Sequence, residues 1–286
     1  MSTPRIMLYG ATGFTAGLII KEAKAQNIPL TLAGRDPTKM GALGKLHGLP
    51  VSVFSLAEKV GPYLRDYDVV IHAAGPFSET YVPMLEGCIQ AGTHYLDITG
   101  EMEVFEGIFA RSAQIRDAGI AAIPGVGFDV VPTDCLAARL AAALPGATHL
   151  ELAFAPVGAA VSRGTTRTMV THMHKGGAIR QDGKIVKVTQ AFRTREIPFR
   201  GGTKTAVTIP WGDVSTAYHS TQIANIMVYM ALLPKQIRGM RLSRPFVPLL
   251  HIRPLRNWLR DKAGAKAKGP SEAAQADAKV ELWGEV

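Results

Sequence analysis

The sequence predicts an α/β fold with two domains. The first is a doubly wound domain with strand order 3-2-1-4-5-6, and the second is an α+β domain with a mixed, largely antiparallel sheet. Three observations predict this fold. Apolar runs alternate with helical stretches up to residue 123, a glycine-rich turn follows the first run, and strand-like runs dominate beyond residue 145. The expected boundaries are 1–127, 128–262, and a linker with an unpaired strand at 263–286.

The first domain contains six short apolar runs of the length and composition typical of buried strands. Helical stretches separate them, which is the pattern of parallel strands joined by crossover helices. The expected strands are 6–9, 30–33, 51–54, 69–73, 95–98 and 120–123, and the expected helices are 14–25, 38–46, 56–64, 80–91 and 102–118.

The second domain begins with a helix at 132–144, because Pro132 suits a first helical turn and Pro145-Gly146 ends the pattern. Consecutive strands without crossover helices then favour antiparallel pairing. The expected strands are 149–154, 185–192, 204–209, 215–220 and 226–229, with one helix at 165–175 and a last strand at 280–286 that has no successor.

A glycine-rich loop lies between the first strand and the first helix. Gly10 permits a tight turn, Gly13 allows a phosphate to approach the backbone, and the small Ala16 lets helix and strand pack closely. The exposed amides of the helix N-terminus then favour a pyrophosphate, so the sequence predicts a Rossmann dinucleotide-binding domain. The residues expected to bind the cofactor in this loop are Gly10, Thr12, Gly13, Phe14 and Thr15.

The residue after the second strand selects the dinucleotide. Arg35 stands where NAD-specific domains carry an acid for the ribose 2′-hydroxyl. A guanidinium bonds well to a 2′-phosphate, so NADP(H) is the expected cofactor. A solvated surface arginine is the alternative reading.

The later strands of the first domain also end in glycine or polar residues. Because ligands of open α/β sheets bind outside the carboxyl ends of the strands, these ends are expected to border the nicotinamide ribose. The expected cofactor-binding residues here are Ala74, Gly75, Pro76, Asp97, Thr99 and Gly127, with Asp97 also a catalytic candidate and Phe128 expected at the substrate.

Candidate chemistry in the second domain is sparser. Arg163, Thr165 and Arg167 precede or open a helix and are expected to bind substrate, with helix capping as the alternative. Tyr218 and His219 are catalytic candidates on opposite faces of the expected 215–220 strand. His219 suits proton donation, with an ordinary surface or core histidine as the alternative. No metal site is expected.

Charge is concentrated in one segment. Residues 235–268 hold ten lysines and arginines and one acid, Asp261. The net charge of this segment, +9, is therefore as large as that of the whole chain. This local segment does not resemble a nucleic-acid-binding face, and its amphipathic helix near Pro254 suggests peripheral contact with an anionic membrane or packing on its own domain. With two cysteines expected in the core and no secretory signal, the sequence predicts a cytoplasmic protein.

Five ordered motifs give a wider resemblance: the Gly10–Thr15 loop, Ala33-Gly34-Arg35, Ala74–Phe77, Tyr95–Glu101 and Gly127–Asp134. Together they resemble the saccharopine dehydrogenase-like family, which includes trans-acting enoyl reductases. This resemblance implies an NADP-dependent oxidoreductase with a Rossmann domain and a mixed α/β substrate or dimerisation domain. This sequence departs from the family at Ala16, where a glycine is usual. Family members also usually continue well past the position of Trp283, so a naturally short or truncated chain is expected.

Three functions are open on these grounds. The leading hypothesis is NADPH-dependent reduction of a C=C (enoyl) or C=N bond in a small or lipid-like substrate. The alternatives are a saccharopine-type amino-acid reductase and a non-catalytic NADP(H)-binding regulator, and a homodimer is a further open expectation. The chain lacks a Tyr-x-x-x-Lys base, a GxSxG elbow, a P-loop and an HExxH motif, which argues against those other chemistries.

Overall fold

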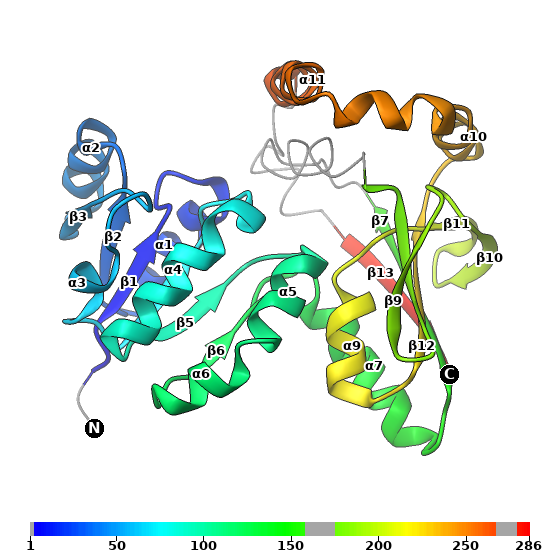
Figure 1. The fold of residues 1–286 in the computed structure, drawn as a ribbon, viewed down its shortest axis with the longest axis horizontal. Coiled ribbons are helices and arrows are strands. Elements are labelled where there is room, and N and C mark those ends of the chain that lie inside the picture. The colour runs from blue at the N-terminus through cyan, green and yellow to red at the C-terminus, as the bar shows by residue number, and fades with distance from the viewer. Residues whose placement is uncertain (1–2, 158–174, 267–278) are drawn as a thin grey trace. The chain divides into compact units, whose positions relative to one another are not determined.

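The structure, a computed structural model, describes residues 3–157, 175–266 and 279–286 (Figure 1). The chain divides into two compact units, Met1–Asp129 and Val130–Val286. Each unit has its own sheet.

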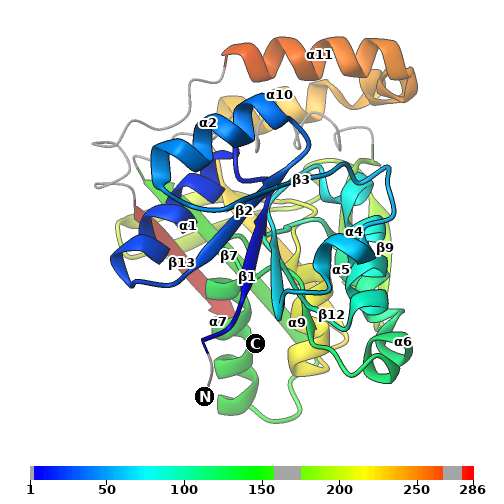
Figure 2. The ribbon, with the colours of Figure 1, turned by 90° about the vertical axis from the view of Figure 1, so that its left-hand side faces the viewer.

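The first unit is built on a six-stranded parallel sheet in the order β3-β2-β1-β4-β5-β6 (Figures 1 and 2). The predicted doubly wound fold is confirmed. Its elements are β1 (Ile6–Tyr9), α1 (Phe14–Ala25), β2 (Leu30–Gly34), α2 (Pro37–His47), β3 (Val51–Val53), α3 (Gly61–Leu64), β4 (Val69–His72), α4 (Phe77–Ala91), β5 (His94–Asp97), α5 (Met102–Phe109), α6 (Ser112–Asp117) and β6 (Ala122–Ile123).

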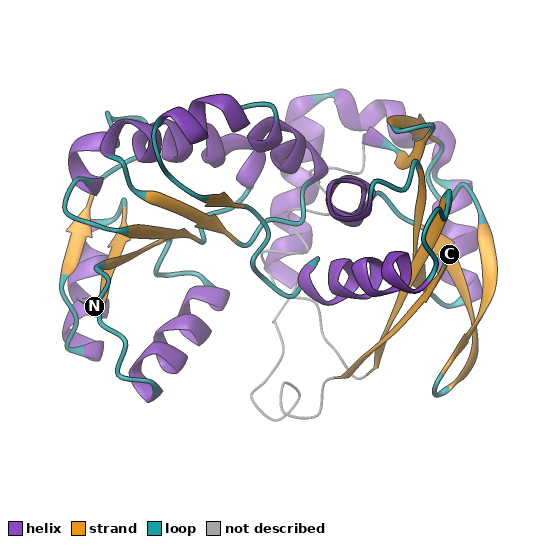
Figure 3. Ribbon diagram, turned by 90° about the horizontal axis from the view of Figure 1, so that it is seen from below, coloured by secondary structure: helices purple, strands orange, loops and turns teal. Residues whose placement is uncertain are grey.

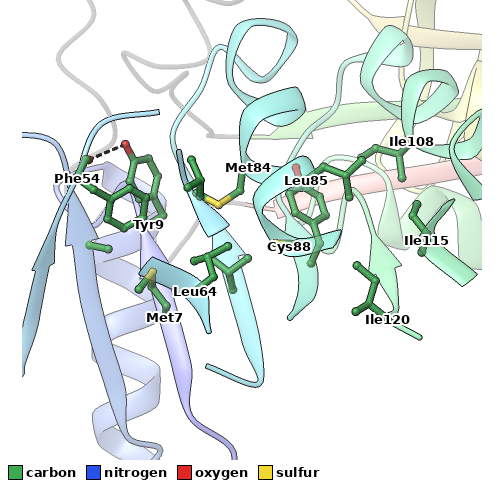
Figure 4. Packing of buried hydrophobic residues seen from close by; sticks show 14 of the residues in the cluster. Met7, Tyr9, Phe54, Leu64, Met84, Leu85, Cys88, Ile108, Ile115 and Ile120 are labelled. Carbon is green, nitrogen blue, oxygen red and sulfur yellow. Dashed lines mark hydrogen bonds between the residues drawn. The ribbon is translucent and has the colours of Figure 1, made fainter. Parts of the chain in front are cut away.

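The first sheet buries both of its faces. Successive side chains of a strand point to opposite faces, so Met7 and Tyr9 of β1 enter one core while Leu8 enters the other. The larger core, drawn in Figure 4, lies between the sheet and helices α3, α4, α5 and α6. The smaller core packs α1 and α2, through Ile20 and Met40, on the other face. Figure 3 shows helices on both sides of this sheet.

Two predicted helices of the first unit are wrong in extent. The expected helix 56–64 is only the short α3, and the expected helix 102–118 is divided into α5 and α6. Arg111, between α5 and α6, has non-helical backbone angles (φ −98°, ψ 10°). Propensity alone did not reveal this break, since none of the residues from 109 to 112 is glycine or proline.

The second unit is a mixed sheet with helices. The strand order is β10-β11-β12-β7-β13, with β8 paired to β12 and β9; β7 and β12 run parallel, and the other pairs are antiparallel. The elements are α7 (Val131–Ala143), β7 (His149–Val157), β8 (Gly177–Gln181), β9 (Lys184–Val188), β10 (Thr194–Phe199), β11 (Gly202–Thr208), α9 (Asp213–Thr221), β12 (Asn225–Ala231), α10 (Pro234–Leu242), the 3₁₀ helix η2 (Arg244–His251), α11 (Arg253–Lys266) and β13 (Lys279–Glu285).

The predicted strand at 215–220 is wrong, because these residues belong to helix α9. Asp213 to Ala217 are all buried, and Ser220 Oγ donates a hydrogen bond to Asp134 Oδ2 of α7 at 2.7 Å. Burial of a continuous run against neighbouring elements outweighs the local preference of threonine and tyrosine for extended structure.

The prediction of an unpaired C-terminal strand is also wrong. β13 pairs antiparallel with β7 along its whole length, from Lys279 opposite Val157 to Glu285 opposite Glu151. The expected strand 185–192 was too long, and β8 and β10 were missed. The expected helix at 165–175 and most of the expected linker lie outside the described residues, although α11 extends to Lys266.

Membrane-spanning helices, metal-binding clusters and the two cysteines were also considered in the sequence. None of its helices is long and apolar enough to cross a membrane. Within the same residues, no group of three or more metal-binding side chains comes together. Cys88 is buried, but Cys135 is exposed, so the expectation that both cysteines lie in the core is wrong for Cys135.

Candidate functional site: the carboxyl edge of the first sheet

The glycine-rich loop is fixed at the carboxyl end of β1. The amides of Gly10 and Ala11 donate to the Ala33 carbonyl at 2.9 and 3.2 Å, and the Gly13 amide donates to the Gly10 carbonyl at 2.9 Å. These bonds hold the loop beside the end of β2. Ligands of open α/β sheets bind at such an edge, next to the strand pair where the order reverses.

Gly10 is required by both its conformation and its surroundings. Its φ is +85°, in the region that favours glycine. A Cβ at this position would lie 2.8 Å from both the Ala73 carbonyl carbon and the Ala74 nitrogen, which are backbone atoms of the neighbouring β4 end. The loop can therefore approach β4 this closely only with glycine at position 10.

The N-terminus of α1 is open. Gly13 is its N-cap in an extended conformation, no side chain of the described residues caps it, and its first turn carries no acid. Thr12, Phe14 and Thr15 around it are exposed. Unpaired amides and the positive end of the helix dipole together favour an anion such as a pyrophosphate.

The N-terminus of α4, in contrast, is already filled. The buried Glu101 carboxylate accepts hydrogen bonds from the Phe77 amide through Oε1 and from the Ser78 amide through Oε2, both at 2.9 Å. A carboxylate of the protein thus takes the place that an anionic ligand would occupy. Of the two helix N-termini that follow β1 and β4, only that of α1 is left for a phosphate.

Arg35 lies directly after β2 and its side chain is exposed. The next residue, Asp36, is an acid at the place where a ribose-binding carboxylate would be sought. However, its side chain caps α2, accepting from the Lys39 amide at 3.0 Å and pairing with the Lys39 ammonium at 3.4 Å. The Asp36 carboxylate is 41% exposed but engaged in this cap, which leaves the exposed Arg35 as the candidate for binding a ligand at the end of β2.

Asp97, at the end of β5, is buried and fully bonded within the protein. Its Oδ2 accepts from the Tyr95 hydroxyl at 2.6 Å, and Oδ1 accepts from the amides of Thr99 at 3.0 Å and Gly125 at 2.8 Å. Burial raises the pKa of Asp97, although these three donors favour its charged form. This geometry supports a role in positioning the loops after β5 and β6.

Thr99 also lies beneath the surface. Its Oγ1 accepts a hydrogen bond from the Glu101 amide at 3.0 Å, so the hydroxyl shapes the turn that presents Glu101 to α4. Gly127 packs on the same segment, since a Cβ there would lie 3.3 Å from Ile98 Cβ. Phe128, the next residue, is 65% exposed.

The turn at residues 74–76 is held by the partly buried Thr80, which lies against the buried His72. Thr80 Oγ1 donates to the Ala74 carbonyl at 2.7 Å and lies 3.0 Å from His72 Nε2. Since the hydroxyl proton is used on Ala74, His72 donates through Nε2, and its Nδ1 has no hydrogen-bond partner among the described residues. Burial lowers the pKa of His72 to about 3, so the imidazole is neutral at physiological pH.

His72 makes the stability of the protein fall in acid. Its pKa of about 3 lies below the ordinary value of 6.5, so below pH 6.5 the unfolded chain binds a proton that the folded chain does not. This contribution to stability is complete above pH 6.5 and is lost at about 1.4 kcal/mol per pH unit as the pH falls toward 3. Urea unfolding at pH 7 and pH 5 should therefore show a loss about 2 kcal/mol larger in the wild type than in His72→Gln.

The control for this pH effect is His47→Gln, which removes a partly exposed imidazole from the end of α2. It measures how much of the difference arises from the loss of any one histidine. Equal losses of stability in wild type and His72→Gln would contradict the assignment of His72.

Of the candidate catalytic and substrate-binding residues of the second unit, only two lie within the described residues. Tyr218 and His219 lie on α9, so the expectation that they face opposite sides of a strand is wrong. The Tyr218 ring lies under the Arg180 guanidinium at 4.2 Å, and its edge meets His219, which is exposed. Arg163, Thr165 and Arg167 lie outside the described residues.

Glu101, His72 and Thr80 were not singled out as site residues from the sequence. A signal existed for His72, because it ends the apolar run of β4 and is followed by two alanines. Glu101 carried no such signal, since its partners Phe77 and Ser78 belong to a different element.

Comparison with known proteins agrees with this geometry. Residues 6–123 match the family of the saccharopine dehydrogenase NADP binding domain. Curated relatives include a trans-acting enoyl reductase of Mycobacterium ulcerans (strain Agy99), 32% identical over 145 residues, which are 45% of this chain and 33% of that protein. A second, from Mycobacterium tuberculosis (strain ATCC 25618 / H37Rv), is 29% identical over 144 residues, again 45% of this chain and 33% of that protein. The chain thus spans about a third of the length of these relatives.

A solved structure shares the fold. Apo histidine-tagged saccharopine dehydrogenase (L-Glu forming) from Saccharomyces cerevisiae superposes with a TM-score of 0.61 at 15% sequence identity, covering 84% of this chain and 57% of that one. At this identity the likeness shows a common fold.

Proposed function

We propose, from the match of residues 6–123 to the saccharopine dehydrogenase NADP binding domain family, that this protein is an NADP(H)-dependent oxidoreductase. Its reaction is the reduction of a C=C (enoyl) or C=N bond in a small or lipid-like substrate. The enoyl reductases among its curated relatives support the first kind of bond. Cytoplasmic localisation and a homodimeric state stay predictions.

The observation that carries the proposal is the open N-terminus of α1 next to the exposed Arg35. The α1 amides suit the pyrophosphate, and the Arg35 guanidinium suits a 2′-phosphate through charge-assisted hydrogen bonds. The α1 N-terminus and Arg35 lie at the ends of the neighbouring strands β1 and β2. The N-terminus of α4 is not available to a phosphate, because Glu101 occupies it. Thr12, Gly13, Phe14 and Thr15 would line the phosphates.

The ends of β4, β5 and β6 would hold the nicotinamide half. When bound, the nicotinamide supplies a hydride. Ala74, Gly75 and Pro76 would support its ribose from a turn fixed by Thr80, and Asp97 would keep the Gly125–Gly127 segment in place. The exposed ring of Phe128 is proposed to contact substrate, and Tyr218 or His219 to supply the proton, with Arg163, Thr165 and Arg167 as further substrate-binding candidates.

Replacing Arg35 should change cofactor choice. Arg35→Asp is expected to weaken NADPH binding by about 1.5–3 kcal/mol, the value of a charged hydrogen bond, while NADH binding is weakened far less. Titration of both dinucleotides by calorimetry measures this difference. Lys21→Asp on the exposed face of α1 makes the same charge change and should leave the preference unaltered. Unchanged NADPH affinity in Arg35→Asp would rule out this role.

The reaction itself is tested by NADPH oxidation with a panel of enoyl thioesters and, separately, of imines formed from amino acids and 2-oxo acids. Oxidation with an enoyl acceptor supports the proposal. Oxidation only with the amino-acid imines would also support a reductase, but it would identify the C=N bond of a saccharopine-type reaction rather than an enoyl bond. Tight NADPH binding without turnover on either panel would identify a non-catalytic NADP(H)-binding regulator.

A further inference from the structure

Residues 234–266, which form α10, η2 and α11, carry large apolar side chains on the surface of the second unit. We call this segment the basic arm. Figures 1 and 2 both place α10 and α11 at the same end of the second unit. The basic arm exposes five large apolar residues, whose exposed fractions are 69% for Leu242, 64% for Phe246, 50% for Leu249, 53% for Ile252 and 56% for Trp258. Single exposed apolar residues are ordinary, but such a group within one segment indicates an interaction surface.

The basic arm is attached to its own domain through other side chains. Ile237 is buried against Ala191 and Val207, and Met240 packs on the same cluster. Arg244 donates to the carbonyls of Gln190 and Ala191, both at 2.8 Å. The side of α10 that packs on the domain is therefore distinct from the exposed apolar group, which intramolecular packing does not account for.

Cations lie beside Leu242, one member of this apolar group. Arg238 and Arg241 are exposed, and together with Leu242 and the hydroxyl-bearing Thr194 and Thr205 they line a cavity of about 320 Å³ under α10. Arg241 Nη2 lies 3.4 Å from Thr194 Oγ1. Two guanidinium groups with neighbouring hydroxyls match the oxygens of a phosphate.

A third cation accompanies the aromatic residue of α11. The Lys262 ammonium lies 4.5 Å from the centre of the Trp258 ring. Trp and Lys side chains, each with an apolar body and a polar tip, suit the boundary between lipid chains and headgroups. The charge of residues 235–268, ten cations against one acid, is complementary to an anionic surface.

We propose that the basic arm docks the protein on an anionic lipid bilayer. Phe246, Leu249 and Trp258 enter the interface, and Arg238 with Arg241 binds lipid phosphate in the cavity under α10. A bilayer is favoured over an acidic protein because the surface offers large exposed apolar side chains together with an excess of one charge, the combination typical of interfacial helices. The inference does not depend on the proposed reaction or on NADP(H) binding.

Vesicle sedimentation of the full chain tests the proposal. We expect binding to phosphatidylcholine vesicles that contain phosphatidylglycerol, weaker binding at about 0.15 M salt, and little on phosphatidylcholine alone. Arg238→Ser/Arg241→Ser should weaken binding about tenfold or more, at roughly fivefold per charge. Phe246→Ser/Leu249→Ser should weaken it by at least about tenfold.

Matched controls come from exposed residues of the first unit. Lys21→Ser/Lys45→Ser and Leu18→Ser/Leu46→Ser remove the same kinds of side chain from α1 and α2, and both should bind like the wild type. The tryptophan fluorescence should shift to the blue on binding, and Trp258→Phe should abolish this shift while Trp211 and Trp283 stay in place.

Three results would overturn the proposal. They are no binding to anionic vesicles at low salt, equal binding to neutral vesicles, and binding that both arm variants leave unchanged. If the arm variants instead abolish a concentration-dependent dimer, and the wild type does not bind vesicles, the arm is an interface between two copies of the chain.

Discussion

Gly10→Ala should destabilise the first unit by about 3 kcal/mol or more and remove measurable NADPH binding. The methyl group would lie 2.8 Å from the Ala73 carbonyl carbon and the Ala74 nitrogen, and backbone atoms cannot rotate away as a side chain can. The positive φ of +85° adds the cost of a left-handed conformation, about 1–2 kcal/mol for a residue with a Cβ. Urea unfolding and NADPH titration measure the two effects.

Gly17→Ala is the matched control, since it makes the same chemical change seven residues later, within α1. A Cβ at Gly17 would have no neighbour within 4 Å among the described residues. Alanine is the better helix former, so this variant should be more stable than the wild type by about 0.5–1 kcal/mol. If Gly10→Ala were as stable as the wild type, the close approach of the loop to β4 would be wrong, whatever the stability of Gly17→Ala.

Glu101→Gln should cost about 3 kcal/mol of stability. The carboxylate accepts hydrogen bonds from two backbone N–H groups at the N-terminus of α4. A glutamine side chain can accept only one of these bonds, because its NH₂ group would face the second N–H group. Loss of the negative charge at the positive end of the helix adds to this cost. The turn at residues 74–76 loosens as a result, so NADPH should also bind more weakly.

Glu79→Gln provides the comparison for Glu101. Glu79 lies in the first turn of the same helix but is exposed, so its removal tests the effect of charge near α4 without the buried bonds. A change within about 0.5 kcal/mol is expected for this surface position. An equal effect of the two substitutions would show that the buried cap contributes nothing beyond general electrostatics.

The sequence predicted those parts of the fold that depend on local patterns. The helix expected at 14–25 is α1 as observed, because a glycine loop and a regular apolar spacing define both its beginning and its packed face. The strand order followed from the alternation of strands and helices, since right-handed crossovers leave few other arrangements. The loop residues Gly10 and Gly13 were identified for the same reason.

Features that rest on distant contacts were not predicted. The Glu101 cap joins residues 24 positions apart, and the bond from Gly125 to Asp97 joins residues 28 apart. β13 finds its partner in β7, far earlier in the chain, so the order of elements could not reveal the pairing. α9 forms from residues with extended preferences because its neighbours bury it, and tertiary packing of this kind is not visible in a local window.

Thermal unfolding with NADPH, NADP⁺, NADH and NAD⁺ tests most directly the claim that the first unit is an NADP(H)-binding domain. Any of the four present at 100 times its Kd would stabilise the folded protein by about 2.7 kcal/mol, so at equal concentrations the tighter ligands raise Tm further. We predict clear stabilisation by NADPH and NADP⁺ and much less by NADH and NAD⁺, with the difference lost in Arg35→Asp. Greater stabilisation by NADH and NAD⁺ would contradict the role of Arg35, and no stabilisation by any of the four would contradict the binding site itself.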